Sequence, residues 1–202
     1  LEAIELLDES HDREEAAEAH EQLVISAVAL GRIDEARALA TRQDELARAL
    51  SPHHQVHAIA VANELAAVFG EWDRLRLLLD PSEDRIEANI ETPCGRHGNV
   101  MYLQAIAHEL TGDARTAQRL ETLAHQRVRS AHSPVVRQLE AQLAFARGNI
   151  DEAVALITDP FDPELARRWW WFAMPATLAY LEIRSAAGLR DDIEAAAGRV
   201  IE

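Results

Sequence analysis

Three histidines in one short stretch are the residues of this chain best suited to metal chemistry. His53 and His57 are four positions apart, with His54 between them, so a helix would place His53 and His57 on one face. Two imidazoles on one face can share a zinc ion, although zinc sites in proteins use three or four protein ligands. The simpler interpretation is a group of solvated residues at the start of a helix. We adopt that interpretation, and the sequence predicts no metal site.

The single cysteine is the second candidate for chemistry. Cys94 and His97 have the Cys-x-x-His spacing of half a metal site, but no second pair accompanies them. One cysteine also excludes an internal disulfide framework, which fits a reducing compartment. We expect Cys94 to be a small buried packing residue and not a reactive thiol.

Motifs that identify common enzyme classes are absent from the sequence. There is no glycine-rich phosphate loop and no Gly-x-Ser-x-Gly segment. His108 and Glu109 begin like a zinc-protease helix, but Gly112 stands where the second histidine is required. The sequence therefore predicts a non-catalytic protein without a cofactor.

An aromatic run near the C-terminus is the third candidate. Residues 167–172 read Arg-Arg-Trp-Trp-Trp-Phe. Successive helical residues point about 100° apart, so Trp169, Trp170 and Trp171 would span roughly 200° of a helix surface. Either this helix packs between two neighbours, or part of the run is exposed and binds a partner, as tryptophan often does at binding hot spots.

A repeated glycine pattern defines the elements that must position these residues. Five of the eight glycines follow a helical stretch, usually with an apolar residue two places later and a small or aliphatic residue five places later. They are Gly31, Gly70, Gly112, Gly148 and Gly188, at spacings of 39, 42, 36 and 40 residues. Glycine ends one helix in the left-handed conformation and the next helix follows. A period of this length predicts stacked helical hairpins.

The hairpins have recognisable starts and interruptions. We expect helices over residues 12–30 and 33–50, and new helix starts at Ser51-Pro52 and Ser133-Pro134. Residues 80–84 should interrupt the second hairpin, residues 92–98 should form a loop, and Pro175 should start or kink the last long helix. Apolar positions at helical spacing, including Ile33 and Leu110, should face the core.

The glycine segments resemble the hairpin turn of tetratricopeptide repeats. Gly31-x-Ile33-x-x-Ala36 and Gly148-x-Ile150-x-x-Ala153 have that family's glycine, apolar and small positions. The period is longer than the family's, Leu75 replaces the small residue once, and the usual tryptophan and tyrosine of the first helix are missing. The pattern is similar to the degenerate long-helix repeats of large bacterial regulators, such as transcriptional activators and cyclase-associated ATPases. Armadillo and HEAT repeats match the period equally well.

This resemblance implies an all-α solenoid of about five antiparallel helical hairpins in a right-handed superhelix. We interpret residues 1–202 as one helical-repeat domain excised from a larger protein. A stack of this kind presents a groove lined by the first helix of each hairpin. The candidate partner-binding residues are the three tryptophans and six residues of the first helices: His57, Asn63, Tyr102, Gln104, Arg137 and Gln138.

The charge of the chain limits its partners. The formal net charge is −15, which argues against direct nucleic-acid binding because phosphates require cations. The acidic stretch with Glu14, Glu15, Glu18 and Glu21 could face a basic partner, or it could be a solvated helix face. No apolar run is long enough to span a bilayer and no signal peptide opens the chain. We therefore expect a cytoplasmic protein.

Two functions fit these observations. The first is a protein- or peptide-binding scaffold that acts as a regulatory module of a bacterial signalling or transcription protein, whose partner can be another domain of the same polypeptide. The second is a small-molecule effector sensor in such a regulator. A homodimer is compatible with both functions.

The tryptophan run gives a first testable prediction. At least one of Trp169, Trp170 and Trp171 should be exposed and should contribute to a dimer or partner contact. Its alanine variant should change stability by less than about 0.5 kcal/mol and weaken association, measured by chemical unfolding and analytical ultracentrifugation. A buried tryptophan should instead lose about 3–5 kcal/mol on truncation to alanine. Equally large losses in all three variants, with unchanged association, would make the run a core element.

Overall fold

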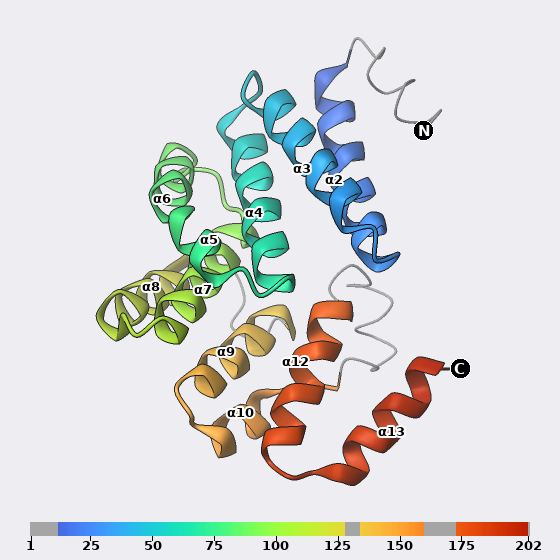
Figure 1. Ribbon diagram of the computed structural model, residues 1–202. Helices are drawn as coiled ribbons and strands as arrows, with labels where there is room; N and C mark the ends of the chain where they lie inside the picture. Colours follow the sequence, from blue (N-terminus) through green and yellow to red (C-terminus); the bar gives the residue numbers. More distant parts are fainter. Residues whose placement is uncertain (1–11, 128–133, 160–172, 202) are drawn as a thin grey trace. The chain divides into compact units, whose positions relative to one another are not determined.

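The computed structural model describes residues 12–127, 134–159 and 173–201, and 82% of these residues are helical, with no strand among them. The eleven described helices, shown in Figure 1, are α2 (Arg13–Ala29), α3 (Ile33–Ala47), α4 (Pro52–Val68), α5 (Trp72–Leu77), α6 (Leu79–Ala88), α7 (Gly95–Leu110), α8 (Ala114–Arg127), α9 (Pro134–Ala146), α10 (Ile150–Leu156), α12 (Ala173–Ala186) and α13 (Arg190–Ile201). The predicted all-α class is confirmed. None of these helices is both long and apolar enough to cross a membrane.

The turns between paired helices follow one backbone pattern. The five glycines of the repeated pattern all have positive φ, from +67° to +86°, and no other described residue does. At Gly31 the amide donates to Val28 O at 2.9 Å, and the next amide, of Arg32, donates to Ala27 O at 2.8 Å. The other four turns have the same two bonds. This is the Schellman end of a helix, which requires a left-handed residue.

At four of the five turns the residue five places after the glycine packs inside the helix pair, and at the fifth turn this residue, Ile193, is half-buried. Ala36, Leu75, Ala117 and Ala153 are all fully buried. A small side chain at this position lets two helix backbones approach closely. The large residue, Leu75, belongs to α5, which has only six residues.

The chain divides into two compact units, residues 1–100 and residues 101–202. The boundary between them falls within α7. In the N-terminal unit, α2 packs against α3, and α4 contacts α2, α3, α5 and α6. Helix α4 is buried along most of its length. The α2–α3–α4 core consists of Val24, Ala27, Ala36, Leu39, Val61 and Leu65.

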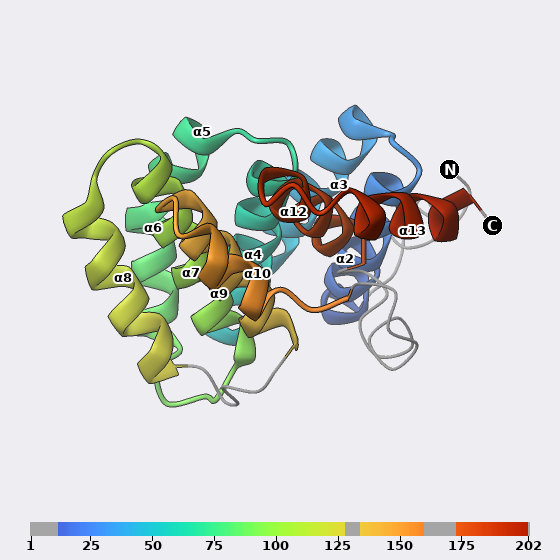
Figure 2. The same ribbon diagram turned by 90° about the horizontal axis from the view of Figure 1, so that it is seen from below.

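In the C-terminal unit, α9 packs against α10, and α12 contacts α9, α10 and α13 (Figure 2). Its core contains Ala141, Ala144, Ala153, Ile157, Tyr180 and Ile183. Both cores therefore combine small and branched side chains from neighbouring helices.

Several predicted details are corrected by the structure. The interruption of the second hairpin falls at Leu78, which ends α5 and begins α6, and not at residues 80–84. Pro81 is accommodated in the first turn of α6, where the helix has no internal acceptor for its missing N–H. Helix α7 begins at Gly95, inside the predicted loop, where Cys94 O accepts from the amide of His97. In contrast, the prediction that Pro175 starts a long helix is confirmed, because Pro175 lies in the first turn of α12.

Two predicted core residues are exposed. Ile33 is 41% exposed and Leu110 is 46% exposed. Ile33 is the first residue of α3 and Leu110 is the last of α7, so both lie beside a turn, where helical spacing no longer determines which side chain is covered. The start at Ser51-Pro52 is confirmed, but the Ser51 hydroxyl bonds His54 Nδ1 at 2.9 Å and does not cap the helix.

The turn geometry predicts opposite outcomes for two glycine-to-alanine substitutions. Gly31→Ala forces a Cβ into a left-handed residue and should lower the free energy of unfolding by about 1 kcal/mol. Gly198→Ala is the control, because Gly198 lies inside α13 at negative φ with open space around it. Alanine there should raise stability by up to about 1 kcal/mol. Urea unfolding measures both, and equal effects would contradict the role assigned to Gly31.

Candidate functional site

A cluster of ionisable side chains lies in the N-terminal unit, where α2, α3, α4 and the start of α7 meet. Glu21 from α2 is 7% exposed. It faces His57 of α4, Gln43 of α3 and Arg96 of α7. The sequence grouped Glu21 with an acidic, solvated face, and this placement is wrong for Glu21 alone: Glu14, Glu15 and Glu18 are exposed.

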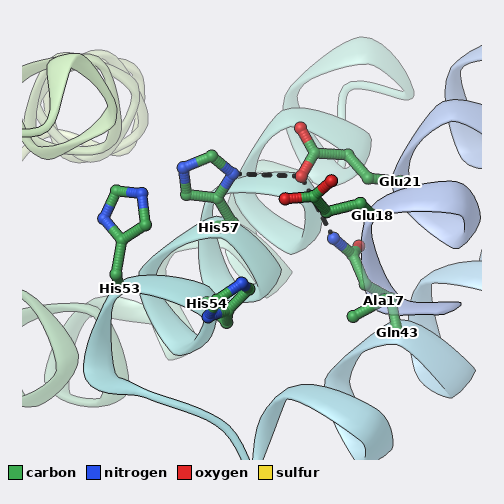
Figure 3. A pocket seen from close by; sticks show the side chains of 7 residues that line it. All are labelled: Ala17, Glu18, Glu21, Gln43, His53, His54 and His57. Atoms are coloured by element: carbon green, nitrogen blue, oxygen red, sulfur yellow. Dashed lines mark hydrogen bonds and ion pairs between the residues drawn. The ribbon is translucent and has the colours of Figure 1, made fainter. Parts of the chain in front are cut away.

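Three hydrogen-bond donors converge on the Glu21 carboxylate. His57 Nδ1 lies 3.2 Å from Oε2, and Gln43 Nε2 donates to the same oxygen at 3.3 Å (Figure 3). Arg96 Nη2 pairs with Oε1. Burial opposes the ionisation of Glu21, but the bond from His57 and the charge of Arg96 outweigh it, so the pKa of Glu21 lies below its usual range.

Arg96 joins two carboxylates from different helices. Its Nη1 donates to Glu64 Oε1 at 2.8 Å, while its Nη2 binds Glu21. The Arg96 side chain is 15% exposed. One guanidinium therefore ties the start of α7 to both α2 and α4, an arrangement that the planar fork of arginine favours.

His57 lies between the carboxylate and the only thiol of the chain. Its Nε2 is 3.8 Å from Cys94 Sγ. Hydrogen bonds with Cys94 and Glu21 raise the pKa of His57 to about 9. Burial opposes ionisation of the Cys94 thiol, but the contacts with His57 and with the Arg96 amide leave its pKa below the usual value. Cys94 is buried, as the sequence predicted, but it does not merely pack.

His53 lies beside this group on the preceding turn of α4. The His53 and His57 rings have centroids 4.7 Å apart, and Figure 3 shows the His57 nitrogen opposite Glu21 directed toward the His53 ring. His53 Nδ1 is buried and has no hydrogen-bond partner among the described residues. One potential ligand atom each from His53, His57 and Cys94 lies within 4.8 Å of the other two.

The side chains of the Cys94-x-x-His97 spacing contact different residues, Cys94 Sγ facing His57 and His97 facing Asn89. His97 is buried, and its Nε2 lies 3.1 Å from Asn89 Nδ2. His54 instead turns toward α2, where its Nε2 is 3.2 Å from Glu14 Oε1. Sequence reasoning missed the Cys94–His57 contact because 37 residues separate the two positions and nothing in their local spacing links them.

A small pocket borders the histidines. It is lined by Ala17, Glu18, Glu21, Gln43, His53, His54 and His57, and its volume is about 40 Å³. A space of this size holds one or a few waters or an ion, whereas drug-sized ligands occupy cavities of hundreds of cubic ångströms.

Two chemistries match this constellation. Cys94, His57 and Glu21 have the order of nucleophile, base and orienting carboxylate, but the thiol is buried and does not line the pocket described above. His53, His57 and Cys94 also have donor types that bind borderline-soft metal ions. The geometry therefore favours an ion over a substrate.

Four of the six predicted partner-binding residues that the structure describes are buried, so for them the predicted place on an open groove is wrong. Asn63, Tyr102, Gln104 and Gln138 are buried. Asn63 donates to Ile59 O at 2.7 Å and Ser82 Oγ at 3.0 Å. Tyr102 donates to Glu140 Oε1 at 3.0 Å, and Gln138 donates to Ala176 O at 3.2 Å.

The remaining candidates are divided between partial exposure and positions outside the described residues. His57 is partly exposed and forms the contacts given above. Arg137 is partly exposed and donates to Ala155 O at 3.4 Å. Trp169, Trp170 and Trp171 lie outside the described residues. The candidate residues of the first helices α4 and α7 thus contribute to the core more than to an open surface.

The buried ion pair gives a prediction about stability. Arg96→Ala should lower the free energy of unfolding by about 3–5 kcal/mol, because Glu21 would remain buried without its cation. The control is Arg32→Ala, whose partner Glu35 is 3.4 Å away with both side chains largely exposed; it should cost less than about 1 kcal/mol. Urea unfolding followed by circular dichroism measures both. Similar losses in the two variants would show that Arg96 has no special role.

Comparison of the chain with models of protein families, with curated proteins and with solved structures finds no match.

Proposed function

We propose that this chain is a partner-binding helical-repeat module, a regulatory part of a larger bacterial signalling or transcription protein. The observation that carries the proposal is the fivefold repeated helix turn, with a left-handed glycine at all five turns and a fully buried residue five places later at four of them. Helix pairs joined in this way typically stack into solenoids, whose function is to bind other chains.

The tetratricopeptide-like solenoid is part of this proposal. The resemblance lies in the turns, where glycine ends the first helix and a small residue such as Ala36 or Ala153 packs between the helices. Sequential packing of α2 with α3 and of α9 with α10 is the local arrangement that such a stack repeats.

A protein or peptide is a better partner than a metabolite. The pocket beside the histidines has a volume of about 40 Å³, which is too small to enclose an organic effector. The net charge of −15 disfavours nucleic acid, since binding there requires cations to replace phosphate counterions. An extended protein surface is therefore the contact that we propose.

Helix α8 is the proposed binding surface. Its buried face consists of Ala117, Leu120 and Ala124. Its other face exposes Arg115, Gln118, Arg119, Thr122, His125 and Gln126. With three arginines against one glutamate, α8 is basic in an acidic chain, so we assign it an acidic peptide segment as partner. This moves the surface from the first helices, which the sequence favoured, to a second helix.

Selection of displayed peptides on the purified chain tests the proposal. Enriched peptides should be acidic, and calorimetry should show at least about tenfold weaker binding to Arg115→Glu, which reverses one exposed charge on α8. Arg13→Glu is the matched control, because Arg13 is an exposed arginine in α2, and it should bind normally.

A thermal-shift screen of the same purified chain distinguishes the competing function, a small-molecule sensor, from the scaffold. If the chain is a scaffold, no compound of a metabolite library should raise its melting temperature, because only a ligand that binds the folded protein stabilises it. No peptide enrichment together with a metabolite that raises the melting temperature would replace the scaffold by the sensor.

A further inference from the structure

The contacts around His57 resemble those of a metal ligand more than those of a simple ion pair. Ligating histidines use one ring nitrogen for the metal and donate the other N–H to a carboxylate or carbonyl. His57 has this division: Nδ1 lies 3.2 Å from Glu21 Oε2, and Nε2 is directed to the Cys94 sulfur. Glu21 is itself held by Gln43 and Arg96, so the ring orientation is fixed.

The separation of His57 and Cys94 matches two ligands of one ion. Zinc lies about 2.3 Å from a cysteine sulfur and about 2.05 Å from a histidine nitrogen, so tetrahedral ligands would be roughly 3.6 Å apart. The observed distance between Sγ and Nε2 is 3.8 Å. The two side chains therefore already stand at the spacing that a shared zinc ion requires.

His53 supplies a third ligand. Its ligating nitrogen lies within 4.8 Å of those of His57 and Cys94, and its ring can close the remaining distance of about 1 Å. The buried Nδ1 of His53 has no hydrogen-bond partner among the described residues.

We propose that His53, His57 and Cys94 bind one zinc ion, with Glu21 orienting His57 and with water in the fourth coordination position. Binding replaces the thiol proton of Cys94, and any proton on the His57 nitrogen, by the metal, and these protons pass to solvent. The pocket that His53 and His57 line is large enough to hold a water. The site does not depend on the proposed partner-binding function, and it revises the expectation of no metal drawn from the sequence.

A second group of potential ligands lies nearby and must be distinguished. Glu14, Glu18 and His54 also place ligand atoms within 4.8 Å of one another. Both carboxylates are exposed, and the group has one nitrogen and no sulfur, which suits zinc less well. Only the site with Cys94 can give a bond between a metal and a thiolate, because Cys94 is the only cysteine.

Titration of the metal-free 202-residue chain with Co²⁺ and Zn²⁺ tests the proposal. Co²⁺ should produce thiolate-to-cobalt charge-transfer absorption together with visible bands of tetrahedral cobalt, and one equivalent of Zn²⁺ should abolish both. Because the measurement uses the unmodified protein, it needs no variant to fold. Absence of the thiolate band, or zinc binding without its loss, would overturn the site.

Variants locate the ligands. His53→Asn should weaken zinc binding at least about tenfold, with an unchanged melting temperature of the metal-free protein, since His53 Nδ1 has no hydrogen bond there to lose. Cys94→Ser should weaken it further. Two controls, His54→Asn and the exposed His125→Gln, should change affinity less than about threefold. Normal affinity in His53→Asn, or a loss of binding in His54→Asn, would contradict the assignment.

Discussion

The left-handed backbone at five glycines is the constraint on which the arrangement of helices depends. Each turn is closed by two bonds between backbone groups, from the glycine amide and from the amide after it. The helix direction therefore reverses through backbone bonds, and at four of the five turns the residue five places later is fully buried. Close packing of the pairs then determines which side chains remain for the core and which face solvent.

A second interaction connects helices that are far apart in the sequence. Arg96 pairs with Glu21 and Glu64, so that the start of α7 is fixed against α2 and α4. The buried Glu21 carboxylate needs a nearby cation or donors to offset its loss of hydration. By fixing Glu21, Arg96 also fixes the acceptor that His57 Nδ1 faces. The ion pair of Arg96 with Glu21 thus positions His57 of α4 and the Cys94 thiol, which directly precedes α7.

The sequence predicted the local structure well and the site poorly, for different physical reasons. Glycine conformation and helical periodicity are local properties, so Gly31, Gly112 and the burial of Ala36 could be read directly. Leu110 failed because periodicity loses its meaning at the last residue of a helix. Glu21, His57 and Cys94 come from three separate segments, and only tertiary packing brings them together. The same packing buried Asn63 and Gln138, which we had expected to line a groove because they lie in first helices.

The backbone nature of the turn bonds has a consequence for how freely this chain can vary. A turn held by peptide groups restricts residue identity at the glycine itself, while the positions around it are restricted only by volume and polarity. Leu75 illustrates this tolerance, because three of the other turns have alanine at the same position. A map of tolerated substitutions should therefore show sharp intolerance at isolated positions about forty residues apart, separated by long permissive stretches. The main departure from that rhythm should be the group around Arg96, where several intolerant residues gather from distant parts of the chain.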